Sequence, residues 1–159
     1  MARYHVDNRL TATQQVLATT FKTQLSLTAA TATLCRGQIV ELSYGADGAP
    51  NATDCQIVYD VSVQTAAGTP SSTVTPTKHN PADVASRTVA AINYTAEGTI
   101  TATSSVWTRS LNQRASQQWY ANPGSELVWP ATNLTGFAVR ALSPTYAANV
   151  LVTTDHDDF

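Results

Sequence analysis

The sequence predicts an all-β protein, an antiparallel β-sandwich or jelly roll with an extended N-terminal arm. Three observations lead to this fold class. Apolar and polar side chains alternate along Cys55–Gln64, and a period of two places alternate residues on opposite faces of a sheet. Roughly one residue in six is Thr, whose branched β-carbon favours strands over helices. Turn-forming residues separate the patterned segments at intervals of roughly 8–12 residues, as in sandwiches and barrels.

The chain has 159 residues, which suits one domain with a sizeable core. We divide it into an N-terminal arm (1–20), a β-sandwich domain (21–154) and an acidic tail (155–159). The arm has weak periodicity, although Ala2–Val6 could form a short strand and Gln14–Leu17 another. Arms of this kind are often ordered only by a partner, and we expect the tail to be frayed.

The first strands of the sandwich domain follow from alternation. In the third of them, Ile57, Tyr59 and Val61 are expected to face the core, and the polar residues opposite, such as Asp60, are expected to face water. The strands expected in this half of the chain are Lys22–Thr28, Leu34–Tyr44 and Cys55–Gln64.

A change of composition follows the third strand. Thr65–Thr77 is rich in Thr, Ser and Pro with little apolar content, which predicts a long loop. Asn80–Asp83 reads as an N-cap residue followed by Pro at the first helical position, which predicts a short helical turn.

The second half of the domain returns to strands. With the first half they total eight to ten short strands, the signature of an antiparallel sandwich or jelly roll. The strands expected here are Arg87–Thr95, Thr99–Arg109, Gln117–Ala121, Glu126–Trp129, Leu134–Leu142 and Asn149–Val152.

Charge is scarce along the chain. Charged residues make up 13% of it, against about 25% in typical domains. A surface of Thr, Ser, Gln and Asn is polar without charge and can lie against another protein at little desolvation cost. The net charge of −2 and the scattered basic residues argue against nucleic acid as the main partner.

Targeting signals and cysteines add two expectations. No stretch approaches the roughly 20 apolar residues that span a bilayer, and the N-terminus has no apolar signal core, so we expect no membrane partner and synthesis in a cytoplasm. Cys35 and Cys55 both lie in strand-like segments. A disulfide between them is geometrically open, but we favour reduced, buried thiols.

No pattern of catalytic or metal-binding residues stands out. The sequence has no nucleophile elbow and no convincing Cys/His pair, so we expect a protein that is not an enzyme and has no cofactor. His5, His79 and His156 lie far apart, whereas zinc ligands usually come in closely spaced pairs. Asp155–Asp158 forms a local cluster with His156 that could bind a cation weakly, but a solvated tail is the interpretation we prefer.

Aromatic residues gather in the last third of the chain. Trp107, Trp119 and Trp129 are candidates for the core, for a subunit contact or for a carbohydrate platform. We favour a subunit contact. The residues expected in that interface are Trp119, Tyr120, Trp129 and Tyr146.

From about Leu25 to Val152, the order of features resembles the decoration or cement proteins of tailed-bacteriophage heads. The likeness lies in the order and character of the segments rather than in a diagnostic motif. It is carried by Gln38–Gly45, Ile57–Thr69, Thr75–Asp83, Tyr94–Glu97, Gly136–Ser143 and Asn149–Val152.

This resemblance implies a non-enzymatic structural virion protein, a β-sandwich subunit that forms a homotrimer on the outer surface of an icosahedral capsid. Such proteins clamp neighbouring subunits of the major capsid protein and stabilise the shell. The arm and the acidic tail lie outside the resemblance, and the arm is our candidate for the segment that reaches the capsid. Its expected contact residues are Tyr4, His5, Val6, Arg9 and Leu10.

Two other functions stay open at this point. One is a receptor-binding or carbohydrate-binding sandwich of a phage tail fibre or spike, which would use Trp119 and Trp129 at the surface. The other is a jelly-roll enzyme with convergent acidic residues, such as a glycosidase.

Overall fold

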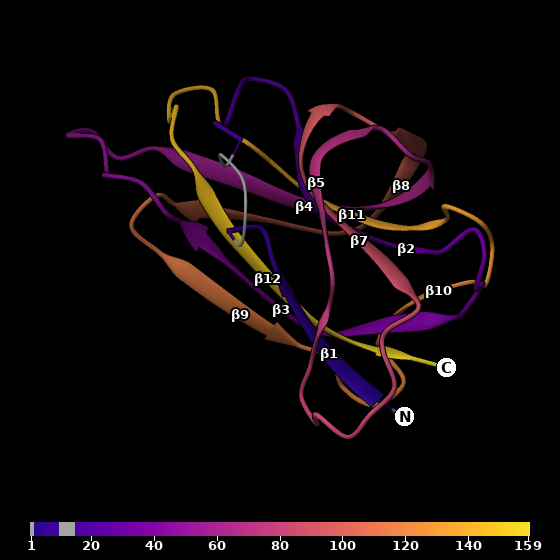
Figure 1. The fold of residues 1–159 in the computed structure, drawn as a ribbon. Coiled ribbons are helices and arrows are strands. Elements are labelled where there is room, and N and C mark those ends of the chain that lie inside the picture. The colour runs from indigo at the N-terminus through magenta and orange to yellow at the C-terminus, as the bar shows by residue number, and fades with distance from the viewer. Residues whose placement is uncertain (1, 10–14) are drawn as a thin grey trace.

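The computed structural model describes residues 2–9 and 15–159, and these form two antiparallel sheets packed face to face (Figure 1). Strands account for 59% of the chain, and no helix occurs in the described part. The predicted all-β sandwich is therefore confirmed, whereas the jelly-roll topology stays a prediction. None of the described residues belongs to a helix that could cross a membrane.

Sheet A contains both ends of the chain. Its strands run in the order β10-β3-β12-β1-β6, and β9 pairs with another part of β3. They are β1 (Ala2–Asp7), β3 (Gly37–Ala46), β6 (Thr77–Lys78), β9 (Ser116–Tyr120), β10 (Leu127–Trp129) and β12 (Val150–Asp158).

Sheet B holds the middle of the chain, in the order β5-β7-β2-β11-β4-β8. Its strands are β2 (Lys22–Ala29), β4 (Gln56–Ala66), β5 (Thr69–Val74), β7 (Thr88–Ala96), β8 (Thr99–Asn112) and β11 (Gly136–Leu142). Most of the strands predicted in the sandwich domain match these within a few residues.

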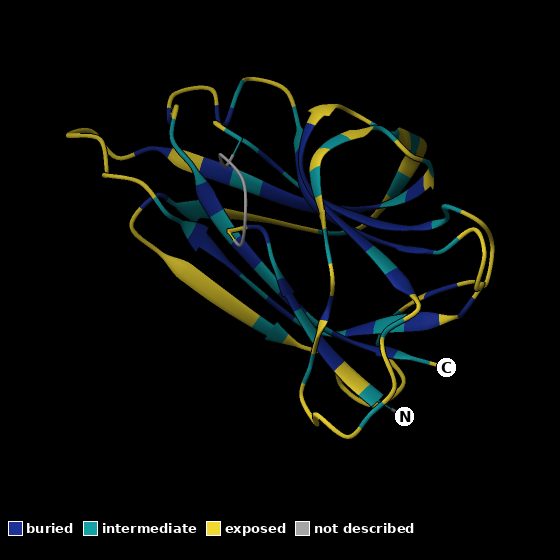
Figure 2. Ribbon diagram, in the orientation of Figure 1, coloured by how far each residue is buried: buried dark blue, intermediate teal, exposed yellow. Residues whose placement is uncertain are grey.

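The core lies between the two sheets, where Figure 2 shows the ribbons in dark blue. Alternate residues of the central strands point into it, as the sequence pattern predicts for Ile57, Tyr59 and Val61 of β4. Each fully buried Val, Leu or Ile contributes roughly 1.5–3 kcal/mol through removal of its apolar surface from water. Cys35 and Cys55 are buried and unpaired, so the expectation of free thiols is confirmed.

The predicted N-terminal arm is wrong over residues 2–7. These residues form β1, which lies between β12 and β6 and pairs with β12 from Ala2↔Asp158 to Asp7↔Thr153. Tyr4 and Val6 point into the core and are buried. The alternation was too short to be convincing in sequence, because only these two side chains face inward.

The predicted frayed tail is also wrong. β12 runs to Asp158, and its acidic side chains are held in place by partners far away in sequence. Arg3 donates to Asp157 (Nε–Oδ1 3.0 Å), and Thr88 donates to Asp158 (Oγ1–Oδ1 2.6 Å). The predicted domain boundaries, 21–154, are therefore too narrow at both ends.

Two further predictions fail between β4 and β7. The segment predicted as a loop, Thr65–Thr77, contains β5 and the start of β6. β5 is an edge strand whose residues alternate between exposed and half-buried, so it lacks the apolar residues by which a strand is recognised. Asn80–Asp83 forms a turn that is not helical. In it, Asn80 Oδ1 accepts a hydrogen bond from the backbone N–H of Ala82.

The second face of β4 is buried at Asp60, Ser62 and Gln64, contrary to the expectation that these residues face water. Asp60 accepts hydrogen bonds from Arg140 (Nη2–Oδ2 2.6 Å) and from Ser62 and Ser105. Burial raises the pKa of Asp60, but these hydrogen bonds outweigh it and leave the pKa below its usual value. The Arg140 guanidinium also lies over the Phe21 ring, 4.6 Å from its centroid.

The partners that enclose Asp60 come from the strands on either side of β4, Ser105 from β8 and Arg140 from β11. Sheet B also curls at one end, where the β4–β5 turn meets the β7–β8 turn (Figure 1). There, Ala66 of β4 pairs with Thr99 of β8, and Thr69 of β5 pairs with Ala96 of β7. A Cβ at Gly68, between β4 and β5, would lie 2.2 Å from the carbonyl oxygen of Ala96. This close approach requires glycine.

His156 is a titratable side chain enclosed in the core between two aromatic rings. Its ring centroid lies 5.5 Å from that of Tyr4 and 6.0 Å from that of Trp129, and neither ring nitrogen has a hydrogen-bond partner among the described residues. Burial lowers the pKa of His156 to about 4, although Asp158 lies 3.8 Å from Nε2 and acts in the opposite direction. The imidazole is therefore neutral at pH 7.

We expect this residue to make the protein acid-sensitive. Its pKa is lower in the folded state than the ordinary 6.5, so its contribution to stability is complete above about pH 6.5 and is lost as the pH falls toward 4. The loss amounts to about 3 kcal/mol in the free energy of unfolding. Urea unfolding of the wild type and His156→Phe between pH 7 and pH 4 measures it. Equal pH dependence in both proteins would contradict this role.

Candidate functional site

Two of the four predicted interface residues belong to the core of the subunit. Trp129 and Tyr146 are each 1% exposed. Trp129 of β10 pairs with Gly37 of β3, and a Cβ at Gly37 would lie 2.1 Å from the Trp129 ring. The indole therefore fills the space that the missing side chain leaves. Neither residue is available to a partner of the folded chain, so this part of the interface prediction is wrong.

The other two, Trp119 and Tyr120, lie on β9 at the edge of sheet A. Tyr120 is 60% exposed, whereas Trp119 is half-buried against the core. Neighbouring residues of a strand point to opposite faces, so the two rings do not form one flat platform. Figure 2 shows β9 as an exposed edge in yellow.

β8 and β9 together form an exposed side of the sandwich, which we call the β8–β9 edge (residues 99–120). β8 is the last strand of sheet B, and β9 follows it along the outside of β3 in sheet A. The turn between them is fixed by Gln113, whose N–H donates to Cys55 O (2.9 Å) and whose Nε2 donates to Thr53 O (3.0 Å). At this turn the chain therefore passes from the edge of sheet B to the edge of sheet A.

The β8–β9 edge is long and almost uncharged. Between residues 99 and 120 the sequence has no Asp, Glu, Lys or Pro and only two charged residues, Arg109 and Arg114. Arg109 lies over the Trp107 ring at 5.3 Å, and Val106 beside it is 47% exposed. Sheet B's opposite edge, β5, contains Pro70, which cannot donate a backbone hydrogen bond to an added strand.

The arm residues that were predicted to contact a capsid do not lie on one surface. Tyr4 and Val6 are in the core, and Leu10 lies outside the described residues. Arg9 is exposed and lies 3.7 Å from Asp47, measured from Nε to Oδ2. His5 reaches the outer face of sheet A, where it belongs to a cluster of different character.

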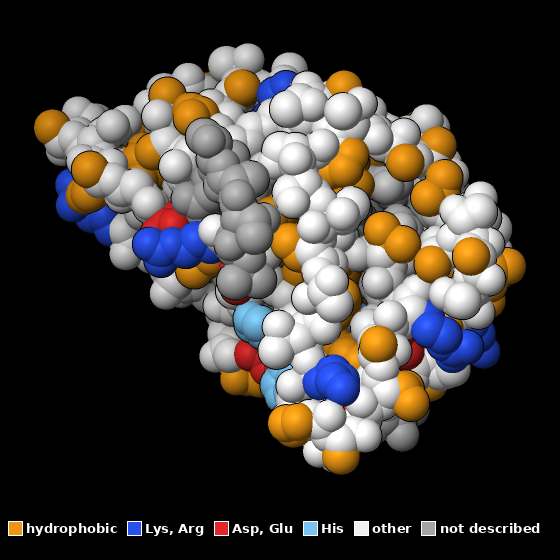
Figure 3. Space-filling model, viewed as in Figure 1, with side chains coloured by type: hydrophobic (Ala, Val, Ile, Leu, Met, Phe, Trp, Pro, Cys, Tyr) orange, Lys and Arg blue, Asp and Glu red, His pale blue; other side chains and the backbone are white. Residues whose placement is uncertain are grey.

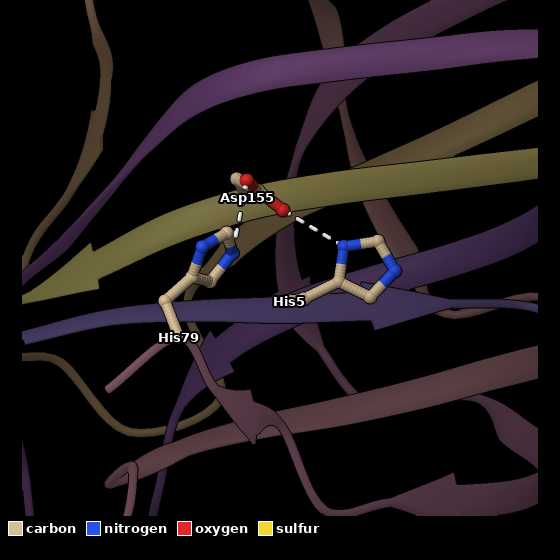
Figure 4. Close-up of side chains that lie close together, drawn as sticks. All are labelled: His5, His79 and Asp155. Carbon is tan, nitrogen blue, oxygen red and sulfur yellow. Dashed lines mark hydrogen bonds and ion pairs between the residues drawn. The ribbon is translucent and has the colours of Figure 1, made fainter. Parts of the chain in front are cut away.

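His5, His79 and Asp155 lie together on the outer face of sheet A (Figure 4). β1 and β12 place His5 opposite Asp155, and His79 follows β6, the next strand beyond β1. His5 Nδ1 lies 2.8 Å from Asp155 Oδ1, and His79 Nε2 lies 3.1 Å from Asp155 Oδ2. Figure 3 shows histidine and acidic atoms side by side at the surface.

Sequence reasoning missed this cluster because its members are separated by most of the chain. His5 and Asp155 alone are 150 residues apart, and only the β1–β12 pairing brings them together. The cluster that the sequence suggested, Asp155–Asp158 with His156, is not a single site. Asp155 points outward, whereas His156 points into the core.

Comparison with protein-family models, with curated proteins and with solved structures finds no match for this chain. The β8–β9 edge and the His5–His79–Asp155 cluster are therefore the two features from which a function can be argued.

We expect truncation of Trp129 and truncation of Tyr120 to change the free energy of unfolding by different amounts. Trp129→Ala empties the space over Gly37 and should lower the free energy of unfolding by about 3–5 kcal/mol. Tyr120→Ala, its matched control at the exposed edge, should change it by less than about 0.5 kcal/mol. Chemical denaturation of both variants measures the difference. A mild effect of Trp129→Ala would contradict the assignment of Trp129 to the core.

Proposed function

We propose that this protein is a non-enzymatic structural component of a phage virion, a decoration protein that binds other subunits through its β8–β9 edge. Its partners are the major capsid protein and further copies of itself in a homotrimer. The location is the outer surface of the head, after synthesis in the host cytoplasm.

The observation that carries this proposal is the exposed strand edge with few charges. β8 is a fourteen-residue strand with no neighbour on its outer side among the described residues. An unpaired edge presents backbone N–H and C=O groups to any added strand, and monomeric proteins usually protect such edges with Lys, Pro or strong bulges. The regular part of β8, Trp107–Asn112, pairs with β4 without a register shift and contains no Lys or Pro, whereas Val106 lies at the register shift that precedes it.

The side chains of the edge suit a protein partner. Thr, Ser and Gln can be covered by another subunit without burying charge. Val106 and Tyr120 supply exposed apolar surface at the two strands, and Tyr is a residue that often anchors interfaces. The only charges are two arginines, so the edge fits a neutral or acidic surface.

A homotrimer would give such an interface the strength it needs. A trimer engages several sites of a symmetric shell at once, so each contact can be weak while the whole binds firmly. The choice of a phage head as the shell rests on the resemblance of Leu25–Val152 to decoration proteins.

The alternative of a carbohydrate-binding sandwich is not supported by the placement of its residues. It depended on Trp119 and Trp129 at the surface, and Trp129 is in the core. We therefore propose only the structural function.

We expect a charge on the edge to weaken association. Val106→Lys adds a positive charge to the exposed strand and, because a buried unpaired charge is costly, should weaken self-association and head binding by at least about tenfold. The measurements are the native mass by light scattering and co-sedimentation with phage heads that lack their decoration protein.

The matched control is Val84→Lys, the same change at a residue that is 75% exposed and lies outside the edge. It should leave both measurements unchanged. A wild-type protein that stays monomeric and does not sediment with heads would refute the proposed function. Binding by Val106→Lys equal to that of the wild type would refute the role of the edge.

A further inference from the structure

Three separate segments hold the ligand atoms of His5, His79 and Asp155 in one place. Six residue pairs join β1 to β12, and the backbone N–H of His79 donates to Arg3 O (3.0 Å). The Asp155 side chain is 14% exposed, and those of His5 and His79 are 40% and 46% exposed. The cluster is thus anchored on its carboxylate side and open to solvent on its imidazole side.

The geometry is close to that of a bound transition metal. The three ligand atoms all lie within 4.8 Å of one another, and the carboxylate lies between the two rings (Figure 4). Zinc is bound by His nitrogen and Asp oxygen at about 2.0–2.2 Å, so its ligand atoms are about 3.3 Å apart in a tetrahedron.

We propose that His5 Nδ1, His79 Nε2 and a carboxylate oxygen of Asp155 bind a Zn²⁺ ion. Two imidazoles and one carboxylate favour zinc and its neighbours in the transition series over Mg²⁺ and Ca²⁺, which prefer oxygen ligands. Three protein ligands leave a fourth position, which faces solvent and takes water.

Asp7 lies on the other side of the His5 ring. Its Oδ1 accepts a hydrogen bond from the backbone N–H of Arg9 (2.8 Å), and its Oδ2 lies 3.8 Å from His5 Nε2. In the structure His5 Nδ1 lies 2.8 Å from Asp155 Oδ1, so Zn²⁺ would replace the proton that these two atoms share. The negative charge of Asp7 is then close enough to favour the proton on Nε2 of the metal-bound ring.

The charges around the cluster also favour a cation. Asp7 and Asp155 lie beside the histidines, and Glu41 of β3 is the cross-strand partner of Asp155. The nearby Arg3 is engaged by Asp157 through two hydrogen bonds. The cluster therefore keeps negative charge that a bound Zn²⁺ neutralises.

A bound ion would fasten β1 and the residue that follows β6 to β12. Because Zn²⁺ would bind the folded chain and not the unfolded one, it should raise the thermal midpoint of unfolding in proportion to the logarithm of its concentration. Its role is to tie the N-terminal strand into sheet A.

The test uses the full-length chain without a polyhistidine tag. Calorimetric titration with ZnCl₂ should give one Zn²⁺ per chain, and His79→Ala and Asp155→Asn should each weaken binding by at least about tenfold. Asp54→Asn, a surface carboxylate remote from the cluster, is the matched control and should bind as the wild type does. MgCl₂ should show no binding.

The three histidines allow a second readout within one molecule. In long-range ¹H–¹⁵N spectra, Zn²⁺ should shift Nδ1 of His5 and Nε2 of His79 and leave the buried His156 unchanged. No binding, or binding that both His79→Ala and Asp155→Asn retain, would refute the site. Shifts confined to one histidine would refute the three-ligand assignment.

Discussion

The pairing of β1 with β12 is the contact on which the rest of sheet A depends. It places both ends of the chain side by side within the sheet (Figure 1) and covers an edge of β12 that would otherwise be exposed. β6 in turn pairs only with β1 among the described strands. The pairing also carries Tyr4 and Val6 into the core, where Tyr4 stacks on His156. Because this contact joins residues about 150 positions apart, the chain entropy lost in forming it must be offset by the packing of the rest of the domain.

The same pairing creates the His5–His79–Asp155 cluster. His5 and Asp155 are cross-strand partners on the outer face, and β6 brings His79 to the same place through β1. Side chains held by strand pairing are better positioned than side chains on free loops, which favours a defined site. Two kinds of contact thus hold β1 in sheet A: apolar side chains are buried on its inner face, and polar side chains make contacts on its outer face.

Sheet B presents a different constraint, since it buries polar groups between its neighbouring strands β11, β4 and β8. Asp60 and Arg140 are acceptable there because each has its partners, and a buried charge without a partner would be costly. The curl also brings the two sides of the sheet together at the Gly68 turn. The regular part of β8 is left outside this closure, and together with β9 it remains as the open edge of the sandwich.

The fold class and the inner face of most strands follow from the sequence alone, because period-two alternation is a local property that Ile57, Tyr59 and Val61 display without any partner strand. Which strands are neighbours becomes known only in the folded chain, since partners such as β1 and β12 share no local signal. For the same reason, Trp129 could be assigned to the core only once Gly37 lay beneath it, and Asp60 to the interior only once Arg140 was its neighbour. The three ligands of the candidate zinc site come from opposite ends and the middle of the chain, so no spacing rule could have joined them.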